Sequence, residues 1–125
     1  MILLDSSAWI EIISDAPRAG AFRGRLEAAK QVLVPTVVLY EVYKWVRREG
    51  PARTADVAVT WMRQHTVVPL DDRLALEAAD FSLENRLAMA DAIVYATARA
   101  YDAPLVTGDA HFATLPGVEY VAPAG

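Results

Sequence analysis

The chain has 125 residues, of which 54% are hydrophobic and 22% charged, with a net charge of −4 and no cysteine. This length fits one globular domain, so we expect a single domain over residues 1–125, and the apolar content excludes a disordered chain. The absence of cysteine excludes disulfides and sulfur-ligated metal sites. Because His65 and His111 lie far apart in the sequence, any metal is expected to bind mainly to oxygen.

The sequence shows neither a membrane span nor a secretory signal. No apolar stretch approaches the roughly 18 to 20 residues that cross a bilayer. Met1 leads directly into the apolar run 2–4 and Asp5, without a basic segment and a small-residue cleavage site. We therefore expect a soluble, cytoplasmic protein that does not associate with a membrane.

Strand-like and helix-like segments alternate along the chain. In order, the pattern predicts a strand at 2–4, helices at 7–14 and 18–29, a strand at 32–34, helices at 37–49 and 52–64, a strand at 66–68, helices at 73–86 and 89–101, and strands at 105–107 and 118–121. Strands that are apolar on both faces and separated by helices are typical of a parallel sheet covered on both sides. Such sheets bind ligands beyond the carboxyl ends of their strands.

Individual helices carry further signals. Ser6 or Ser7 can cap the first helix. The helix predicted at 37–49 is apolar almost all round. The helix predicted at 73–86 has an acidic stripe that we expect to face solvent. The apolar positions on its other side include Leu74, Ala78 and Leu83.

The charge distribution bears on nucleic-acid binding. A net charge of −4 argues mildly against it, unless several acids form one metal pocket, because bound divalent cations invert the local potential. The cations fall into two segments, and each is interpreted as part of a solvated helix face: Arg18, Arg23 and Arg25, then Lys44, Arg47, Arg48 and Arg53.

Two acids lie inside apolar helical segments. Asp91 has only apolar residues three and four positions away, so it needs a partner from elsewhere in the fold or is a first-turn acid of its helix. Glu41 interrupts the helix predicted at 37–49, and the simpler interpretation is an ion pair with Lys44, three residues on.

Two further acids follow predicted strands. Asp5 comes directly after the first strand, where it can also cap the following helix, and Asp109 follows 105–107, where turn chemistry alone explains Gly108 and the acid.

Four acids brought together would repel one another unless cations held them, so metal binding explains the set economically. Oxygen ligands favour Mg²⁺ or Mn²⁺ and thus phosphoryl chemistry, with a metal-activated water rather than a side chain as nucleophile. Hydroxyl groups beside these acids, on Ser6, Ser7 and Thr107, are expected to support them.

With these residues placed, the chain resembles the PIN-domain nucleases, and most closely the VapC-like toxins of prokaryotic toxin–antitoxin pairs. The resemblance covers nearly the whole length. It rests on the order and spacing of four blocks: Leu3-Leu4-Asp5-Ser6-Ser7-Ala8-Trp9-Ile10, Pro35-Thr36-Val37-Val38-Leu39-Tyr40-Glu41-Val42, Ala90-Asp91-Ala92-Ile93-Val94-Tyr95-Ala96-Thr97-Ala98 and Leu105-Val106-Thr107-Gly108-Asp109-Ala110-His111-Phe112.

The resemblance implies a three-layer α/β/α sandwich around a parallel sheet. It also implies an endoribonuclease whose Mg²⁺ or Mn²⁺ is held by Asp5, Glu41, Asp91 and Asp109. Ser7 and Thr107 match positions where the family often carries a small polar residue that supports the site. His111 stands where relatives carry another acid, so whether one or two ions bind stays open.

Partners follow from the same resemblance. It implies an RNA substrate, a cognate antitoxin that blocks the site, and a toxin homodimer. Large apolar residues are expected to pack mainly in the core, with part of the set free to form a partner groove: Trp9, Ile12, Ile13, Phe22, Val42, Trp45 and Val46.

Two other functions compete with the nuclease. A PIN-like module could act through protein binding after losing catalysis, and the intact set of four acids disfavours this. A phosphotransfer domain could use Asp5 as nucleophile. Such sites usually add a neighbouring acid and a lysine, whereas Ser6 and Ser7 follow Asp5 and the only lysines are Lys30 and Lys44.

Overall fold

A computed structural model of the chain describes residues 1–123. Its centre is one sheet of five parallel strands in the order β3-β2-β1-β4-β5. The strands are β1 (Ile2–Leu4), β2 (Val32–Pro35), β3 (Thr66–Val68), β4 (Leu105–Thr107) and β5 (Val118–Tyr120). Every residue of β1, β2 and β4 is buried, which explains their continuous apolar sequence.

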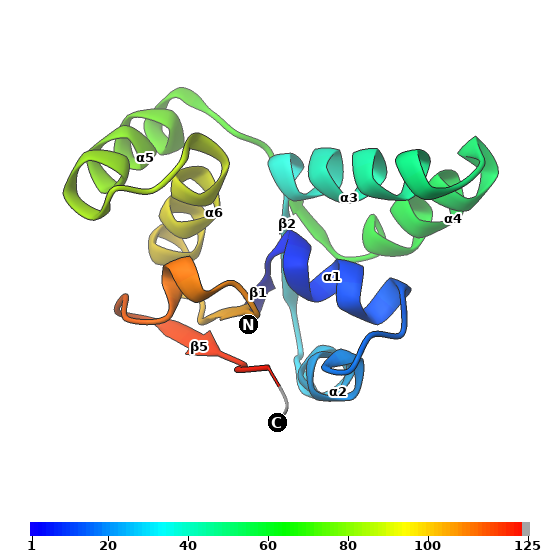
Figure 1. Cartoon of the computed structure of the whole chain (residues 1–125). Coiled ribbons are helices and arrows are strands. Elements are labelled where there is room, and N and C mark those ends of the chain that lie inside the picture. The colour runs from blue at the N-terminus through cyan, green and yellow to red at the C-terminus, as the bar shows by residue number, and fades with distance from the viewer. Residues whose placement is uncertain (124–125) are drawn as a thin grey trace.

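Helices cover the sheet in two layers (Figure 1). α1 (Ser6–Ile13), α2 (Ala19–Ala28), α3 (Thr36–Glu49) and α4 (Ala52–Met62) lie on one face. α5 (Asp72–Asn85) and α6 (Met89–Ala100) pair closely on the other face. This arrangement is the predicted three-layer α/β/α sandwich. It follows from the strand order. The chain runs from β1 through β2 to β3 in one direction and then returns to β4 on the other side of β1, and right-handed crossovers in opposite directions place their helices on opposite faces of the sheet.

The predicted elements are all present, with ends that match or differ by at most two residues. The sequence did not predict the short 3₁₀ helix η1 (Ala110–Phe112) that follows β4. Of the candidate caps of α1, Asp5 is the one that acts, because its carboxylate accepts a hydrogen bond from the Ala8 amide at 3.1 Å. The caps expected at Ser6 or Ser7 are wrong, because both residues are already helical. The predicted domain ends at residue 125, and its last two residues lie outside the described part of the chain.

The core holds most, but not all, of the expected residues. Among the large apolar residues proposed for a partner groove, only Ile13 and Trp45 are partly exposed, so the set belongs to the core. Leu83, placed on the apolar side of α5, is instead 83% exposed. α3 is also not buried all round, because Tyr40 is 61% exposed and its buried residues form one stripe, Val38, Val42 and Val46. Within residues 1–123, no helix has the length and apolar character needed to cross a membrane.

The topology brings distant segments together at one edge. β1 and β4 are neighbours, and Leu4 is paired with Val106. Asp5 follows Leu4 and Thr107 follows Val106, so these two residues lie side by side. α3 follows β2, and its contacts with α1 and α6 bring it to the same edge. The carboxyl ends of the central strands are therefore the place to examine for a site.

Candidate metal centre

Asp5 is the most buried acid of the site. It is 4% exposed, and its carboxylate accepts hydrogen bonds from the Ser7 hydroxyl at 2.7 Å, the Ala8 amide at 3.1 Å and the Thr107 hydroxyl at 2.6 Å. Burial raises the pKa of Asp5 to about 6; the three hydrogen bonds oppose this rise, and the neighbouring charge of Asp109 adds to it. Such a carboxylate is poised to accept a cation.

Thr107 joins Asp5 to Asp109. Its hydroxyl is fully buried, donates to Asp5 Oδ2 and accepts from the Asp109 amide at 2.9 Å. The Ser7 hydroxyl makes a parallel link, since it donates to Asp5 Oδ1 and accepts from the Gly108 amide at 3.2 Å. The two hydroxyl groups therefore fix the turn after β4 against the start of α1, as ligand-orienting groups do in metal sites.

Asp91 and Glu41 approach this network from two helices. Asp91 lies in the first turn of α6, its side chain is 25% exposed, and burial raises its pKa, with further contributions from the charges of Asp109 and Glu41. Glu41 Oε1 accepts a hydrogen bond from the Ser6 hydroxyl at 3.0 Å. The expected ion pair with Lys44 does not form, because the Lys44 ammonium lies over the Tyr40 ring. The structure thus places all four predicted acids at one edge.

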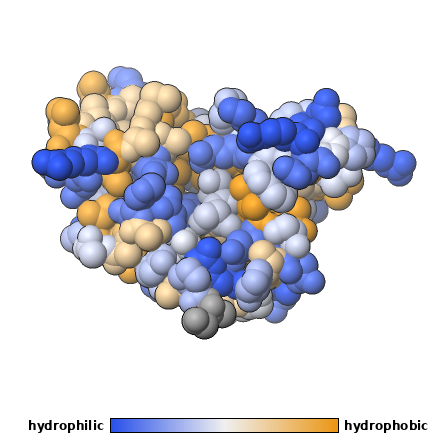
Figure 2. All heavy atoms as spheres, in the orientation of Figure 1, coloured by the Kyte–Doolittle hydropathy of each residue, from blue (hydrophilic) through white to orange (hydrophobic). Residues whose placement is uncertain are grey.

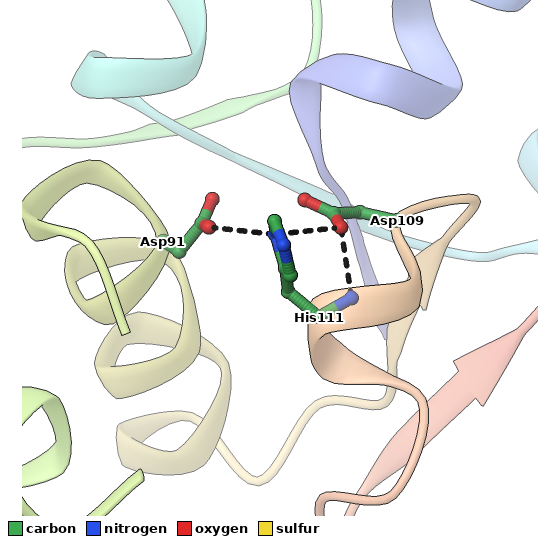
Figure 3. Close-up of side chains that lie close together, drawn as sticks. All are labelled: Asp91, Asp109 and His111. Carbon is green, nitrogen blue, oxygen red and sulfur yellow. Dashed lines mark hydrogen bonds and ion pairs between the residues drawn. The ribbon is translucent and has the colours of Figure 1, made fainter. Parts of the chain in front are cut away.

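His111, which the sequence analysis did not place among the site residues, lies beside two of the acids. Its Nδ1 lies 3.2 Å from Asp109 Oδ1 and 3.9 Å from Asp91 Oδ2, between the two carboxylates (Figure 3). A carboxylate oxygen of Asp91, a carboxylate oxygen of Asp109 and an imidazole nitrogen of His111 all lie within 4.8 Å of one another. The signal that could have found this residue is its place two positions after Asp109, in the first turn of a helix that Asp109 caps.

The donor set suits a divalent cation. Four carboxylates and one imidazole lie at this edge of the sheet, and three of these residues, Asp91, Asp109 and His111, bring ligand atoms within 4.8 Å of one another. No lysine or arginine pairs with any of these acids among residues 1–123. Asp91 and Asp109 are partly open to solvent, which leaves room for water or a phosphate oxygen on the ion. Oxygen ligands fit Mg²⁺ and Mn²⁺, and the imidazole nitrogen is the softer ligand that Mn²⁺ tolerates better.

Arg18 supports the turn that carries Asp109. The sequence interpretation as a solvated cation is wrong: its side chain is 17% exposed and its Nε donates to Glu11 at 3.0 Å. Its Nη1 donates to the carbonyl oxygens of Gly108 and Val121 at 3.0 and 2.8 Å. A Cβ on Gly108 would lie 2.8 Å from the guanidinium carbon, so close packing rather than a left-handed backbone explains this glycine.

Fold and site together define a class: a three-layer α/β/α domain with an acidic centre at the carboxyl ends of a parallel sheet. The PIN domain family model matches residues 2–118, and the chain therefore belongs to the PIN-domain family. No protein of curated function matches the sequence.

Solved structures share the fold over almost the whole chain. A toxin–antitoxin complex from Klebsiella pneumoniae is 23% identical, with a TM-score of 0.80, and the match covers 95% of this chain and 96% of that one. VapC20 of Mycobacterium tuberculosis, described as a toxin that cleaves the sarcin-ricin loop, is 21% identical, with a TM-score of 0.79 and coverage of 98% and 100%. VapBC2 of Rickettsia felis, bound to a promoter DNA fragment, is 17% identical, with a TM-score of 0.78 and coverage of 96% and 98%.

Proposed function

We propose that the protein is a Mg²⁺- or Mn²⁺-dependent endoribonuclease that acts as the toxin of a toxin–antitoxin pair. The observation that carries the proposal is the convergence of Asp5, Glu41, Asp91 and Asp109, from four separate segments, without a lysine or arginine to balance them within the described chain. A divalent cation bound there would neutralise charge on a phosphodiester and activate the attacking water.

The residues have distinct parts in this proposal. Asp91 and Asp109, which are partly exposed, hold the cation where substrate can reach it, together with Asp5 beneath them. Glu41, held by Ser6, faces Asp91 from α3 and completes the acidic set. Ser7 and Thr107 keep the Asp5 carboxylate oriented. None of the three hydroxyls is placed as a nucleophile, because each already bonds a carboxylate.

The proposed partners are a cognate antitoxin, an RNA substrate and a second copy of the chain. The Klebsiella and Rickettsia structures are complexes of a toxin with its antitoxin, which supports the first partner. The M. tuberculosis neighbour cleaves an RNA loop, which supports the second. Apolar side chains exposed on α5 and α6, Leu76, Leu83 and Met89, supply surface for a homodimer. We place the protein in the cytoplasm, where its RNA and its antitoxin would be made.

The test is incubation of the purified protein with total RNA in Mg²⁺, Mn²⁺ or chelator, followed by mapping of the new RNA ends. We expect cleavage with either metal and none in chelator. Asp5→Asn and Asp91→Asn should abolish cleavage, whereas Asp80→Asn, an exposed acid on α5, should retain it. Cleavage that survives in both site variants would refute the site. Metal binding without any cleavage would favour a module that acts only through protein binding.

A further inference from the structure

α3 carries a cationic surface next to the acidic centre. We define the α3 basic face as the exposed residues that surround one shallow hollow on this helix: Tyr40, Tyr43, Lys44, Arg47 and Arg48. Figure 2 shows hydrophilic side chains gathered over α3 at the upper right of the molecule. In a protein with a net charge of −4, such a concentration of cations calls for an explanation.

The cations of this face lack acidic partners in the described part of the chain. Within residues 1–123, Lys44, Arg47 and Arg48 form no salt bridge, and Arg47 only donates to the Gly50 carbonyl at 3.2 Å. Arg18, Arg25 and Arg73, on other elements, each pair with a carboxylate. The α3 cations are therefore available to an anionic ligand.

Two aromatic rings stand among these cations. Tyr40 is 61% and Tyr43 39% exposed, and the Lys44 ammonium lies 5.5 Å from the centre of the Tyr40 ring. An exposed aromatic ring offers a flat surface on which a nucleic-acid base can stack, and neighbouring cations can contact the phosphates. An acidic protein segment would use the cations but would gain nothing comparable from the rings. The combination favours single-stranded nucleic acid.

The α3 basic face lies next to the acidic centre, because Glu41 belongs to the same helix. Tyr40 precedes Glu41 directly, and Lys44 and Arg48 follow Glu41 by three and seven residues on neighbouring turns. At about 1.5 Å per residue, the distance along the helix from Glu41 to Arg48 is roughly 10 Å. A strand whose phosphate lies at the acids can thus extend along α3.

We propose that the α3 basic face binds the single-stranded RNA that flanks the cleaved phosphate, with bases stacked on Tyr40 and Tyr43 and phosphates held by Lys44, Arg47 and Arg48. Its relation to the cleaved bond rests on the proposed nuclease function. Binding itself does not, and it can be measured without cleavage.

The test is fluorescence anisotropy of a labelled 12-nucleotide single-stranded RNA titrated with protein in chelator, at several salt concentrations. For Lys44→Ser/Arg47→Ser/Arg48→Ser we expect weaker binding and a salt slope smaller by about 2, since each lost phosphate contact on a single strand removes about 0.7. For Tyr40→Ala/Tyr43→Ala we expect affinity to fall about tenfold or more with the salt slope unchanged. All eight side chains altered in these variants and in the control below are exposed, so far-ultraviolet circular dichroism and thermal unfolding should match wild type.

A charge-matched control separates this face from general electrostatics. Lys30→Ser/Arg63→Ser/Arg73→Ser removes the same charge from exposed positions elsewhere and should change the salt slope little. The proposal is overturned if this control weakens binding as much, if neither α3 variant does, or if polyglutamate of equal charge displaces the RNA as well as unlabelled RNA does. If the wild type cleaves RNA, the α3 variants should raise KM with kcat nearly unchanged. Failure of cleavage alone would count against the nuclease and leave the binding result intact.

Discussion

Asp5 combines deep burial with a charge that the protein alone does not compensate. Its folded pKa of about 6 lies above its ordinary value of 3.8, so the folded state holds the proton more tightly than the unfolded state. The stability that comes from this proton is complete below about pH 4 and is lost as the pH rises through about 6.

We therefore expect the metal-free protein to lose about 3 kcal/mol of unfolding free energy between pH 4 and pH 7 through this group, given about 1.4 kcal/mol per pKa unit. Asp5→Asn cannot ionise and should lack this loss. Urea unfolding in chelator at a series of pH values checks the difference between the two proteins. Parallel pH profiles would show that Asp5 does not titrate in this range.

Arg18 and Gly108 form a contact whose energetics can be isolated. Gly108→Ala should destabilise the protein by about 1–3 kcal/mol, because the new methyl group meets the guanidinium at 2.8 Å. In an Arg18→Ala background the same methyl group should cost little, because the Gly108 backbone is not among the left-handed residues. Urea unfolding of the four proteins in a double-mutant cycle measures the coupling.

The control for this cycle is Gly24→Ala. Gly24 lies in α2 with no atom within 4 Å of an added Cβ, so the substitution should stabilise the helix by about 0.5–1 kcal/mol. Equal costs of Gly108→Ala in both backgrounds would mean that Arg18 does not set the packing of the turn.

At the scale of elements, the ends of β1 and β4 are joined by the Thr107 hydroxyl. Thr107→Val keeps the shape but leaves one Asp5 oxygen and the Asp109 amide without that partner, at a cost of about 1–3 kcal/mol. Metal affinity should fall by about 10- to 100-fold, because the ligands lose their orientation. Isothermal titration with Mn²⁺ checks this. Thr97→Val, which removes another buried hydroxyl on α6, should leave metal affinity unchanged.

Element types could be predicted because short apolar runs and helical periodicity are local signals. The sequence could not decide which of Asp5, Ser6 and Ser7 caps α1, nor how far Tyr40 is exposed, because both depend on the tertiary structure around each helix. For the site, residue chemistry singled out the four acids as candidates, whereas the contacts of Arg18 are with Gly108 and Val121, 90 and 103 residues away. Such contacts leave no pattern in a single sequence.

For the whole molecule, a cation bound only by the folded state must raise its stability. At 100 times the dissociation constant, Mn²⁺ should add about 2.7 kcal/mol to the unfolding free energy. Differential scanning calorimetry should show a higher Tm with Mn²⁺ for wild type and for Asp80→Asn, and little change for Asp91→Asn. A shift of the same size in Asp91→Asn would place the bound ion elsewhere.

The strand order has a consequence for synthesis. β1 is synthesised before the other strands but occupies the middle of the sheet, and one of its two neighbours, β4, is made about a hundred residues later. The hydrogen bonds that join Asp5 to Thr107 and Thr107 to Asp109 can therefore form only after β4 has been synthesised. Under the proposed function, a growing chain that has reached only α6 would still lack Thr107 and Asp109 and should not yet cleave the RNA around it.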